Sequence, residues 1–205
     1  MVGIDVVHLN WSSGTSGAPP YQHRNFLNRV AAPHERSWVL DSAQPDAALW
    51  QLWAAKEATY KALSPASDAP AFRPAHISVE WRNRGQASTG EAQWGSGRTC
   101  IAARSEGDCA YAIAVRTGRA PIAIEHAVVP FDDMMPHRPC TPSAQSEAAR
   151  RLTAYVLGLI GIRGAVIARA DSGRPYVKDQ PHVSVSWSHD GPWVAAIAAM
   201  EGGIH

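Results

Sequence analysis

The alternation of apolar and polar positions predicts that the chain begins with a strand of a sheet. Residues 2–9 are rich in β-branched side chains and alternate with a period of two, as a strand does. This period places Asp5 and Val7 on one face of the strand and His8 on the other. The chain is therefore expected to open inside a sheet, with one acidic residue on its first strand.

Helical and strand patterns follow in the first half of the chain. A segment rich in serine, glycine and proline predicts a loop at residues 12–20. Helices are predicted at residues 25–31 and 35–40, and a longer one begins near Pro45, which suits a first helical turn, and carries residues 52–63. Strands are predicted at residues 76–81, 99–104 and 109–115, with glycine-rich turns between them.

The second half repeats this order. The pattern predicts a strand at residues 122–129, an irregular proline-rich loop at 130–143 and an amphipathic helix at 143–161. Further strands are predicted at residues 164–170, 172–177, 182–188 and 193–200. Each half thus runs strand, helix, several strands, and ends in an alanine-rich strand after a short polar turn, which is a weak internal repeat.

Composition and charge narrow the functional classes. The chain has 205 residues, 45% of them hydrophobic and 18% charged, as in a globular protein. Nineteen basic and 18 acidic residues leave a net charge of +1, so we expect no broad surface for nucleic acid or an anionic membrane. Three cysteines without CxxC spacing favour neither a disulfide framework nor a zinc knuckle.

The same features bear on location. The most apolar run, residues 153–162, ends at Arg163 and falls short of the roughly 20 residues that cross a bilayer. The first residues show no basic leader followed by a sustained apolar core. We therefore expect a protein of the reducing cytoplasm that is neither secreted nor inserted in a membrane.

The helix over residues 52–63 carries charges among apolar side chains. Glu57 and Lys61 are one turn apart and share a face with Trp53. One interpretation of Glu57 and Lys61 is a solvated i,i+4 ion pair. For Asp5, the corresponding interpretation is a position in a turn or at a sheet edge. Carboxylates that converge from a strand and a helix are, however, what Mg²⁺ requires, with phosphate oxygens and water as its other ligands.

Two polar segments in the second half are candidates for binding. Residues 172–175 read Ser-Gly-Arg-Pro, and residues 185–189 read Val-Ser-Trp-Ser-His. A turn, or a histidine satisfied by its neighbours, is the alternative, and Ser188 does not lie in the G-x-S-x-G elbow of a hydrolase. Arg150, near the start of the second long helix, is either a phosphate ligand or a solvated surface arginine.

Together these segments resemble the 4'-phosphopantetheinyl transferase family over nearly the whole chain. The family's motifs are a G-x-D strand, a W/F-x-x-KEA-x-x-K helix, an upstream F-x-x-R-x-x-x-x-x-E segment, a G-K/R-P turn and an S-x-S/T-H strand. In this sequence they correspond, in the same order, to Gly3 and Asp5; Trp53, Lys56, Glu57, Ala58 and Lys61; Phe26, Arg29 and Glu35; Gly173, Arg174 and Pro175; and Ser186, Ser188 and His189.

The resemblance implies an α+β fold of two similar halves, each an antiparallel sheet packed with a long helix, that form a pseudo-twofold dimer in one chain. The halves would be residues 1–118, with the metal and catalytic motifs, and residues 119–205, with the coenzyme A motifs. In the larger, fused members of the family the coenzyme half comes first, so this chain resembles them with its halves in swapped, circularly permuted order. A fused pair supplies its own interface, which favours a monomer.

The activity implied is Mg²⁺-dependent transfer of 4'-phosphopantetheine from coenzyme A to a serine of an acyl or peptidyl carrier protein, with release of adenosine 3',5'-bisphosphate. The resemblance assigns the metal to Asp5 and Glu57 and catalysis to Glu57 and Lys61. It assigns coenzyme A binding to four residues: Arg150, Arg174, Ser188 and His189. One departure is Val7, since larger members carry an acidic residue two positions after the motif aspartate.

Two other interpretations stay open at this point. The first is a coenzyme A-binding pseudoenzyme that has lost catalysis, as the Val7 position suggests. The second is a different coenzyme A-dependent tailoring enzyme on the same scaffold, because a fold does not fix a chemistry. The fate of coenzyme A distinguishes both from the transferase. A pseudoenzyme would release coenzyme A intact, and a tailoring enzyme would form a product other than a pantetheinylated serine.

Overall fold

The computed structural model describes residues 1–9, 24–64, 70–83, 85–118 and 120–202. In the first half the elements are β1 (Val2–His8), α1 (Arg24–Val30), α2 (Pro33–Leu40), α3 (Pro45–Leu63), a 3-10 turn (Pro74–His76), β2 (Ile77–Trp81), β3 (Ala87–Trp94), β4 (Gly97–Glu106) and β5 (Cys109–Arg116). In the second half they are β6 (Pro121–Pro130), α4 (Phe131–Met134), α5 (Pro142–Leu159), β7 (Ile167–Arg169), β8 (Pro175–Val177), β9 (Val183–Asp190) and β10 (Trp193–Glu201).

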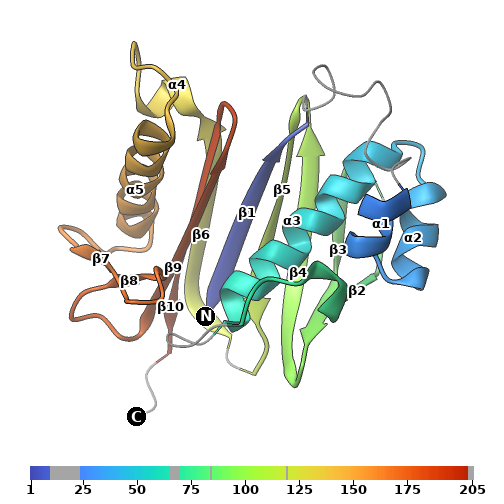
Figure 1. The fold of residues 1–205 in the computed structure, drawn as a ribbon. Helices are drawn as coiled ribbons and strands as arrows, with labels where there is room; N and C mark the ends of the chain where they lie inside the picture. The colour runs from blue at the N-terminus through green and yellow to red at the C-terminus, as the bar shows by residue number, and fades with distance from the viewer. Residues whose placement is uncertain (10–23, 65–69, 84, 119, 203–205) are drawn as a thin grey trace.

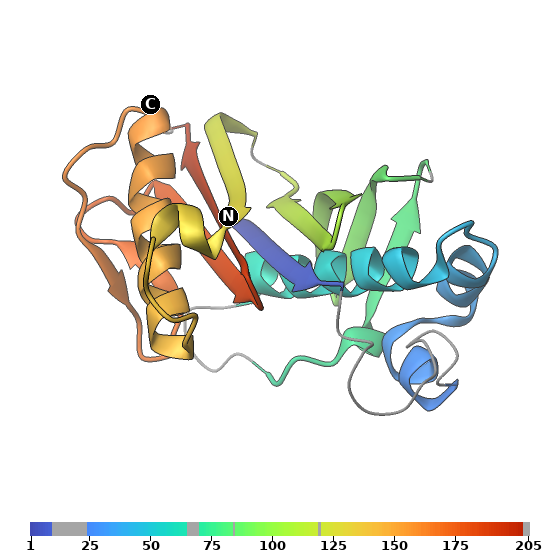
Figure 2. The same cartoon turned by 90° about the horizontal axis from the view of Figure 1, so that it is seen from above.

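The strands form two main antiparallel sheets, each covered by one long helix. The first sheet has the order β1-β5-β4-β3-β2, the second has the order β6-β10-β9, and β7 and β8 form a separate pair. Figure 1 shows α3 against the first sheet and α5 against the second. Seen from above, α1 and α2 lie at the end of α3 that is farther from α5 (Figure 2). Within the described ranges, no helix has the length and apolar character needed to cross a bilayer.

Most of the predicted elements are confirmed, with two corrections. A glycine-rich turn was expected between residues 81 and 99, but this segment contains β3, which pairs with both β2 and β4. A Cβ added at Gly90 would lie 2.2 Å from the backbone carbonyl oxygen of Glu80. This position therefore cannot carry the β-branched or aromatic side chain that would have marked the segment as a strand. The loop at residues 130–143 begins with one regular turn, α4, whose Phe131 is buried. The loop predicted at residues 12–20 lies outside the described residues.

The two halves share part of their topology. In each, the first strand pairs antiparallel with the last, and the last pairs with the strand before it, giving β1-β5-β4 and β6-β10-β9. In each half the long helix also comes after the first strand and before the remaining strands along the chain. The mixed fold with antiparallel sheets is as expected, whereas the pseudo-twofold relation and the swapped order of the halves stay predictions.

An apolar cluster joins the two sheets. Val2, Ile4 and Val6 of β1 are buried together with Ala195 and Ile197 of β10. The opposite face of β1 packs on α3, so β1 is buried on both faces. The strand that carries Asp5 is therefore held between the helix of the first half and the sheet of the second.

Gly3 sets how closely β1 approaches α3. A side chain at this position would place its Cβ 2.0 Å from the Ala58 carbonyl oxygen and 2.9 Å from the Ala62 nitrogen, both of which belong to the helix backbone. The Gly3→Ala substitution is therefore expected to lower the free energy of unfolding by roughly 3 kcal/mol, because β1 and α3 must separate. Urea denaturation followed by circular dichroism measures this change.

Gly158 provides the matched control for this prediction. It lies near the end of α5, and a Cβ added there meets no atom within 4 Å. Gly158→Ala is expected to raise the free energy of unfolding by about 0.5–1 kcal/mol, since alanine restricts the unfolded chain and favours a helix. Equal effects of the two substitutions would show that the contact between Gly3 and α3 does not limit stability.

Candidate active site

The site is built on one face of α3. Pro45 begins this helix, and apolar residues bury most of its circumference between β1, the first sheet and α2. Glu57 and Lys61 are one helical turn apart, and the distance from Glu57 Oε1 to Lys61 Nζ is 3.4 Å. Both remain partly exposed, unlike their helical neighbours Ala54 and Ala58. The helix thus presents one charged pair at an opening in an otherwise apolar surface.

Four side chains from three elements meet at this opening. Asp5, which is only 3% exposed, projects from β1 and accepts a hydrogen bond from Lys61 Nζ at 2.7 Å through Oδ1. The same oxygen accepts the Ser188 hydroxyl of β9, also at 2.7 Å. Lys61 additionally donates to the Ile4 carbonyl at 3.1 Å. The structure thus brings together Asp5, Glu57, Lys61 and Ser188, which the sequence assigned to one site.

Burial and neighbouring charges set the electrostatics of the site. The pKa of Asp5 is raised to about 6: burial raises it most, the charge of Lys61 partly offsets this, and the charge of Glu57 adds to the increase. Burial alone would lower the pKa of Lys61, but the charges of Asp5 and then Glu57 outweigh it and hold that pKa above its usual value. Two carboxylates therefore share one lysine, and the site carries negative charge that a further cation would relieve.

A cavity of about 360 Å³ opens on one side of the Asp5–Lys61 pair. Its polar wall includes Asp5, Glu57, Ser188 and His189, and its apolar wall is formed by three aromatic side chains, Phe26, Trp50 and Trp53. These three rings contact one another, with centroids 5.6 to 6.2 Å apart. We call this the carboxylate cavity. Among the residues that the structure describes, no lysine or arginine lines it.

A second cavity, of about 240 Å³, opens on the other side and has the opposite charge. It is lined by Lys61, Arg169 and Arg174 together with the turn at residues 172–175. Arg174 donates to the Ser64 carbonyl at 2.7 Å, so it reaches from the second half onto the end of α3. Burial, and then Arg116, lower the pKa of Arg174. We call this the arginine cavity, and its cations suit a phosphorylated ligand.

The two remaining predicted ligands behave differently. His189 lines the carboxylate cavity and lies 3.2 Å from the Ser146 hydroxyl through Nε2. Burial, and then the charge of Lys61, lower its pKa. Arg150 is exposed on α5 and, among the described residues, lines neither cavity. The structure thus groups His189 with the site but leaves the proposed phosphate contact of Arg150 without support.

Lys56, the other charged residue of the motif helix, points away from the site. It is fully buried and donates to Glu35 Oε2 at 2.6 Å and to the carbonyls of Val30 at 2.8 Å and Pro74 at 3.1 Å. Glu35 in turn accepts from the backbone N–H groups of Ala32 and Val79. This pair ties α1, α2 and the start of β2 to α3. The sequence analysis singled out both residues as motif positions but missed their contact.

The aromatic wall was also missed, although the sequence carried a signal. Trp50 and Trp53 are three residues apart on a helix, and Phe26 lies in the upstream motif, so helical spacing places the two tryptophans on one side of α3. Trp53 also contacts Phe72, with ring centroids 5.5 Å apart. A stripe of this kind more often fills a core, and only the cavity shows that these rings border the carboxylates.

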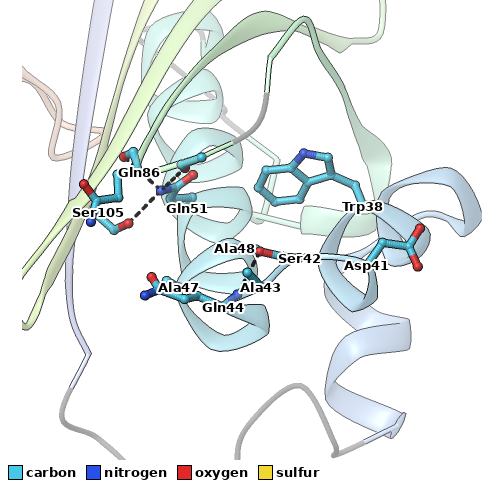
Figure 3. Close-up of a pocket in the computed structure, with 11 residues that line it drawn as sticks. Trp38, Asp41, Ser42, Ala43, Gln44, Ala47, Ala48, Gln51, Gln86 and Ser105 are labelled. Carbon is cyan, nitrogen blue, oxygen red and sulfur yellow. Dashed lines mark hydrogen bonds between the residues drawn. The ribbon is translucent and has the colours of Figure 1, made fainter.

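A third cavity, of about 340 Å³, lies near the start of α3, away from the motif residues. Figure 3 shows the Gln51 amide bonded toward Gln86 and Ser105, with Trp38 across from them. Gln51 Nε2 donates to the Ser105 hydroxyl at 2.9 Å and to the Gln86 carbonyl at 3.2 Å, and its Oε1 accepts from Ser88. These bonds satisfy the buried amide, so Gln51 links α3 to the end of the first sheet.

The donor set of the site fits a magnesium ion. Asp5 and Glu57 supply carboxylate oxygens, which Mg²⁺ prefers, and Lys61 between them shows that positive charge is accommodated there. Among the described residues, no group of three or more histidine, cysteine, aspartate or glutamate side chains is placed to hold a metal. Two protein ligands suffice for Mg²⁺, which commonly keeps water and substrate phosphate in its shell.

Comparison with known proteins places the chain in a family. Residues 1–115 match the model of the 4'-phosphopantetheinyl transferase superfamily. The match covers β1, α3 and the first sheet up to the last residue but one of β5, and it includes Asp5, Glu57 and Lys61. The chain therefore belongs to the 4'-phosphopantetheinyl transferase superfamily, whose general activity is phosphopantetheinyl transfer. No significant match was found among curated proteins or among solved structures.

Proposed function

We propose that this protein transfers the 4'-phosphopantetheine group of coenzyme A to a serine hydroxyl of an acyl or peptidyl carrier protein. The observation that carries the proposal is the position of Asp5, Glu57 and Lys61 between two cavities of opposite charge. The arginine cavity suits the phosphates of coenzyme A, and the carboxylate cavity suits a neutral hydroxyl and the uncharged pantetheine arm.

The reaction joins the serine oxygen to the phosphorus that carries pantetheine and breaks the bond from that phosphorus to the pyrophosphate bridge oxygen. Glu57, at the border of the carboxylate cavity, takes the proton from the serine hydroxyl. Lys61, which lines the arginine cavity, stabilises the charge on the departing adenosine 3',5'-bisphosphate. Arg174 holds the nucleotide end of coenzyme A in the arginine cavity, and His189 contacts the coenzyme from the carboxylate cavity, beside the pantetheine arm.

A Mg²⁺ ion held by Asp5 and Glu57 would neutralise the pyrophosphate and orient it for in-line attack. The chain itself contributes position. Because β1 is packed between α3 and the second sheet, the backbone that carries Asp5 is held in position beside Glu57 and Lys61. The lysine also keeps the two carboxylates from repelling each other before substrate binds. In enzymes that transfer phosphoryl groups, most of the rate enhancement comes from such positioning together with electrostatic stabilisation.

Intact-protein mass spectrometry of a panel of apo carrier proteins tests this function. Each carrier is incubated with the protein, coenzyme A and Mg²⁺, and in parallel with the Asp5→Asn variant. A gain of one phosphopantetheine mass with the parent protein, absent with Asp5→Asn, is the expected result. If no carrier gains mass while coenzyme A binds and is recovered intact, the protein is a coenzyme A-binding pseudoenzyme. A different product from coenzyme A would indicate another reaction on the same scaffold.

Arg174 is expected to contribute to the affinity for coenzyme A more than to catalysis. Arg174→Gln removes one cation from the arginine cavity and should raise KM for coenzyme A about 10- to 100-fold, with a smaller change in kcat, because a charge-assisted bond to phosphate is lost. Steady-state kinetics at varied coenzyme A measures both constants. Arg151→Gln, at an exposed arginine of α5 paired with Glu147, is the control and should leave KM unchanged.

A further inference from the structure

Among the described strands, none pairs with the edge of β1 that faces the second half. On one side β1 pairs with β5 over its whole length, and in the order of the first sheet it is the terminal strand. On the other side it meets β9, which pairs with β10 in the second sheet. The outward backbone groups of β1 must therefore find partners other than a neighbouring strand.

Alternate side chains of β9 supply these partners. Val2 donates its backbone N–H to the Ser184 hydroxyl at 3.0 Å, and Ile4 donates to the Ser186 hydroxyl at 3.3 Å. At the far end, the backbone N–H of His8 donates to Asp190 Oδ2 at 2.9 Å. We call this series, with Ser188 included, the β9 ladder. Since its members are two residues apart, they share the face of β9 that meets β1.

Ser188 is the one member of the β9 ladder that bonds to a side chain of β1, whereas the other three accept from backbone N–H groups of β1. Its hydroxyl donates to Asp5 Oδ1, the oxygen that also accepts from Lys61. No hydrogen bond to Asp5 Oδ2 from another described residue is present. One oxygen of the carboxylate is therefore fixed from two sides, by α3 and by β9, and the other oxygen is left for a ligand.

We propose that Ser188 is a positioning residue for Asp5, held in register by Ser184 and Ser186. It would orient the carboxylate so that Oδ2 faces the cation and the substrate, and it would make the second half part of the metal site. The role in transfer rests on the proposed function, whereas the role in orienting Asp5 toward a cation does not. It differs from the coenzyme A contact that the sequence predicted for Ser188, because the hydroxyl is already engaged by Asp5.

The geometry separates this role from a merely structural one. Ser184 and Ser186 are 9% and 5% exposed and accept from the backbone of β1, so their loss should weaken the junction of the two halves. Ser188 lies at the border of the carboxylate cavity and bonds to a proposed metal ligand. Groups that hold a metal ligand in place usually affect metal affinity about 10- to 100-fold when they are removed.

The test compares Ser188→Ala, Ser188→Thr and Ser184→Ala with the parent protein. The readouts are Mn²⁺ binding without substrate, followed by the electron paramagnetic resonance signal of the free ion, and the thermal midpoint of unfolding. Ser188→Ala is expected to weaken Mn²⁺ binding about tenfold. Ser188→Thr keeps the hydroxyl and should restore the affinity. Ser184→Ala is expected to lower the midpoint by about 2–4 °C, with Mn²⁺ affinity unchanged.

The outcomes distinguish this inference from the proposed function. If Ser188→Ala binds Mn²⁺ as tightly as the parent, or if the parent binds none, the inference is wrong even where carrier proteins are modified. If Mn²⁺ affinity falls in Ser188→Ala and returns in Ser188→Thr while no carrier gains mass, the inference holds and the transferase function fails. Where transfer occurs, kcat should fall in Ser188→Ala with KM for coenzyme A little changed, whereas loss of a coenzyme A contact would raise KM.

Discussion

Replacing Glu57 by glutamine is expected to lower the rate of phosphopantetheine transfer about a thousandfold. The substitution keeps the size and the partial exposure of the side chain but removes the base that accepts the serine proton and one of two carboxylate oxygen donors for a cation. Lys61 keeps its bond to Asp5, so the local fold should persist. The time course of carrier modification, followed by intact-protein mass spectrometry, gives the rate.

The control for this prediction is Glu125→Gln, at an exposed glutamate of β6 that lines neither cavity of the site. Its transfer rate should stay within about twofold of the parent, and both variants should unfold within a few degrees of it, as expected for substitutions away from a buried contact. A Glu57→Gln variant that transfers at a tenth of the parent rate or faster would show that another group takes the proton.

The residues that the sequence assigns to the site were found from local signals. The period of two over residues 2–9 fixed the face of β1 that carries Asp5, and the helical period fixed Glu57 and Lys61 on one side of α3. The family motifs then related strand to helix, which no periodicity could do. The structure agrees with that relation, since Lys61 bonds to Asp5 across 56 positions in the chain.

The contacts that were missed depend on elements whose relative position the sequence does not encode locally. The partner of Ser188 is Asp5, which lies 183 positions away, and a hydroxyl on a strand offers no sign of what it will meet. β3 was missed because all its residues except Trp94 are small or polar and include Gly90, so neither β-propensity nor a clear alternation marks it. Its strand character comes from pairing with β2 and β4 on both sides.

Breaking the buried pair of Lys56 and Glu35 is expected to have the largest effect on stability. Both side chains have no solvent exposure, and each is bonded to two backbone groups besides its partner. Lys56→Met leaves the Glu35 carboxylate buried without its cation, which should lower the free energy of unfolding by about 3–5 kcal/mol. Urea unfolding followed by tryptophan fluorescence measures the loss. Trp38 is buried in the apolar core of the first half and Trp53 packs against that core, so both report its unfolding.

The double variant separates the cost of an unpaired charge from the net value of the pair. Replacing both residues, as Lys56→Met with Glu35→Leu, should recover part of the loss, because no isolated charge remains. Recovery should be incomplete, since the backbone carbonyl of Val30 and the N–H of Val79 lose their partners. The control, Glu91→Gln in the exposed pair with Arg82, should change stability by less than about 0.5 kcal/mol. A Lys56→Met variant as stable as this control would mean that the buried pair does not limit stability and that the other contacts hold α1 and α2 on α3.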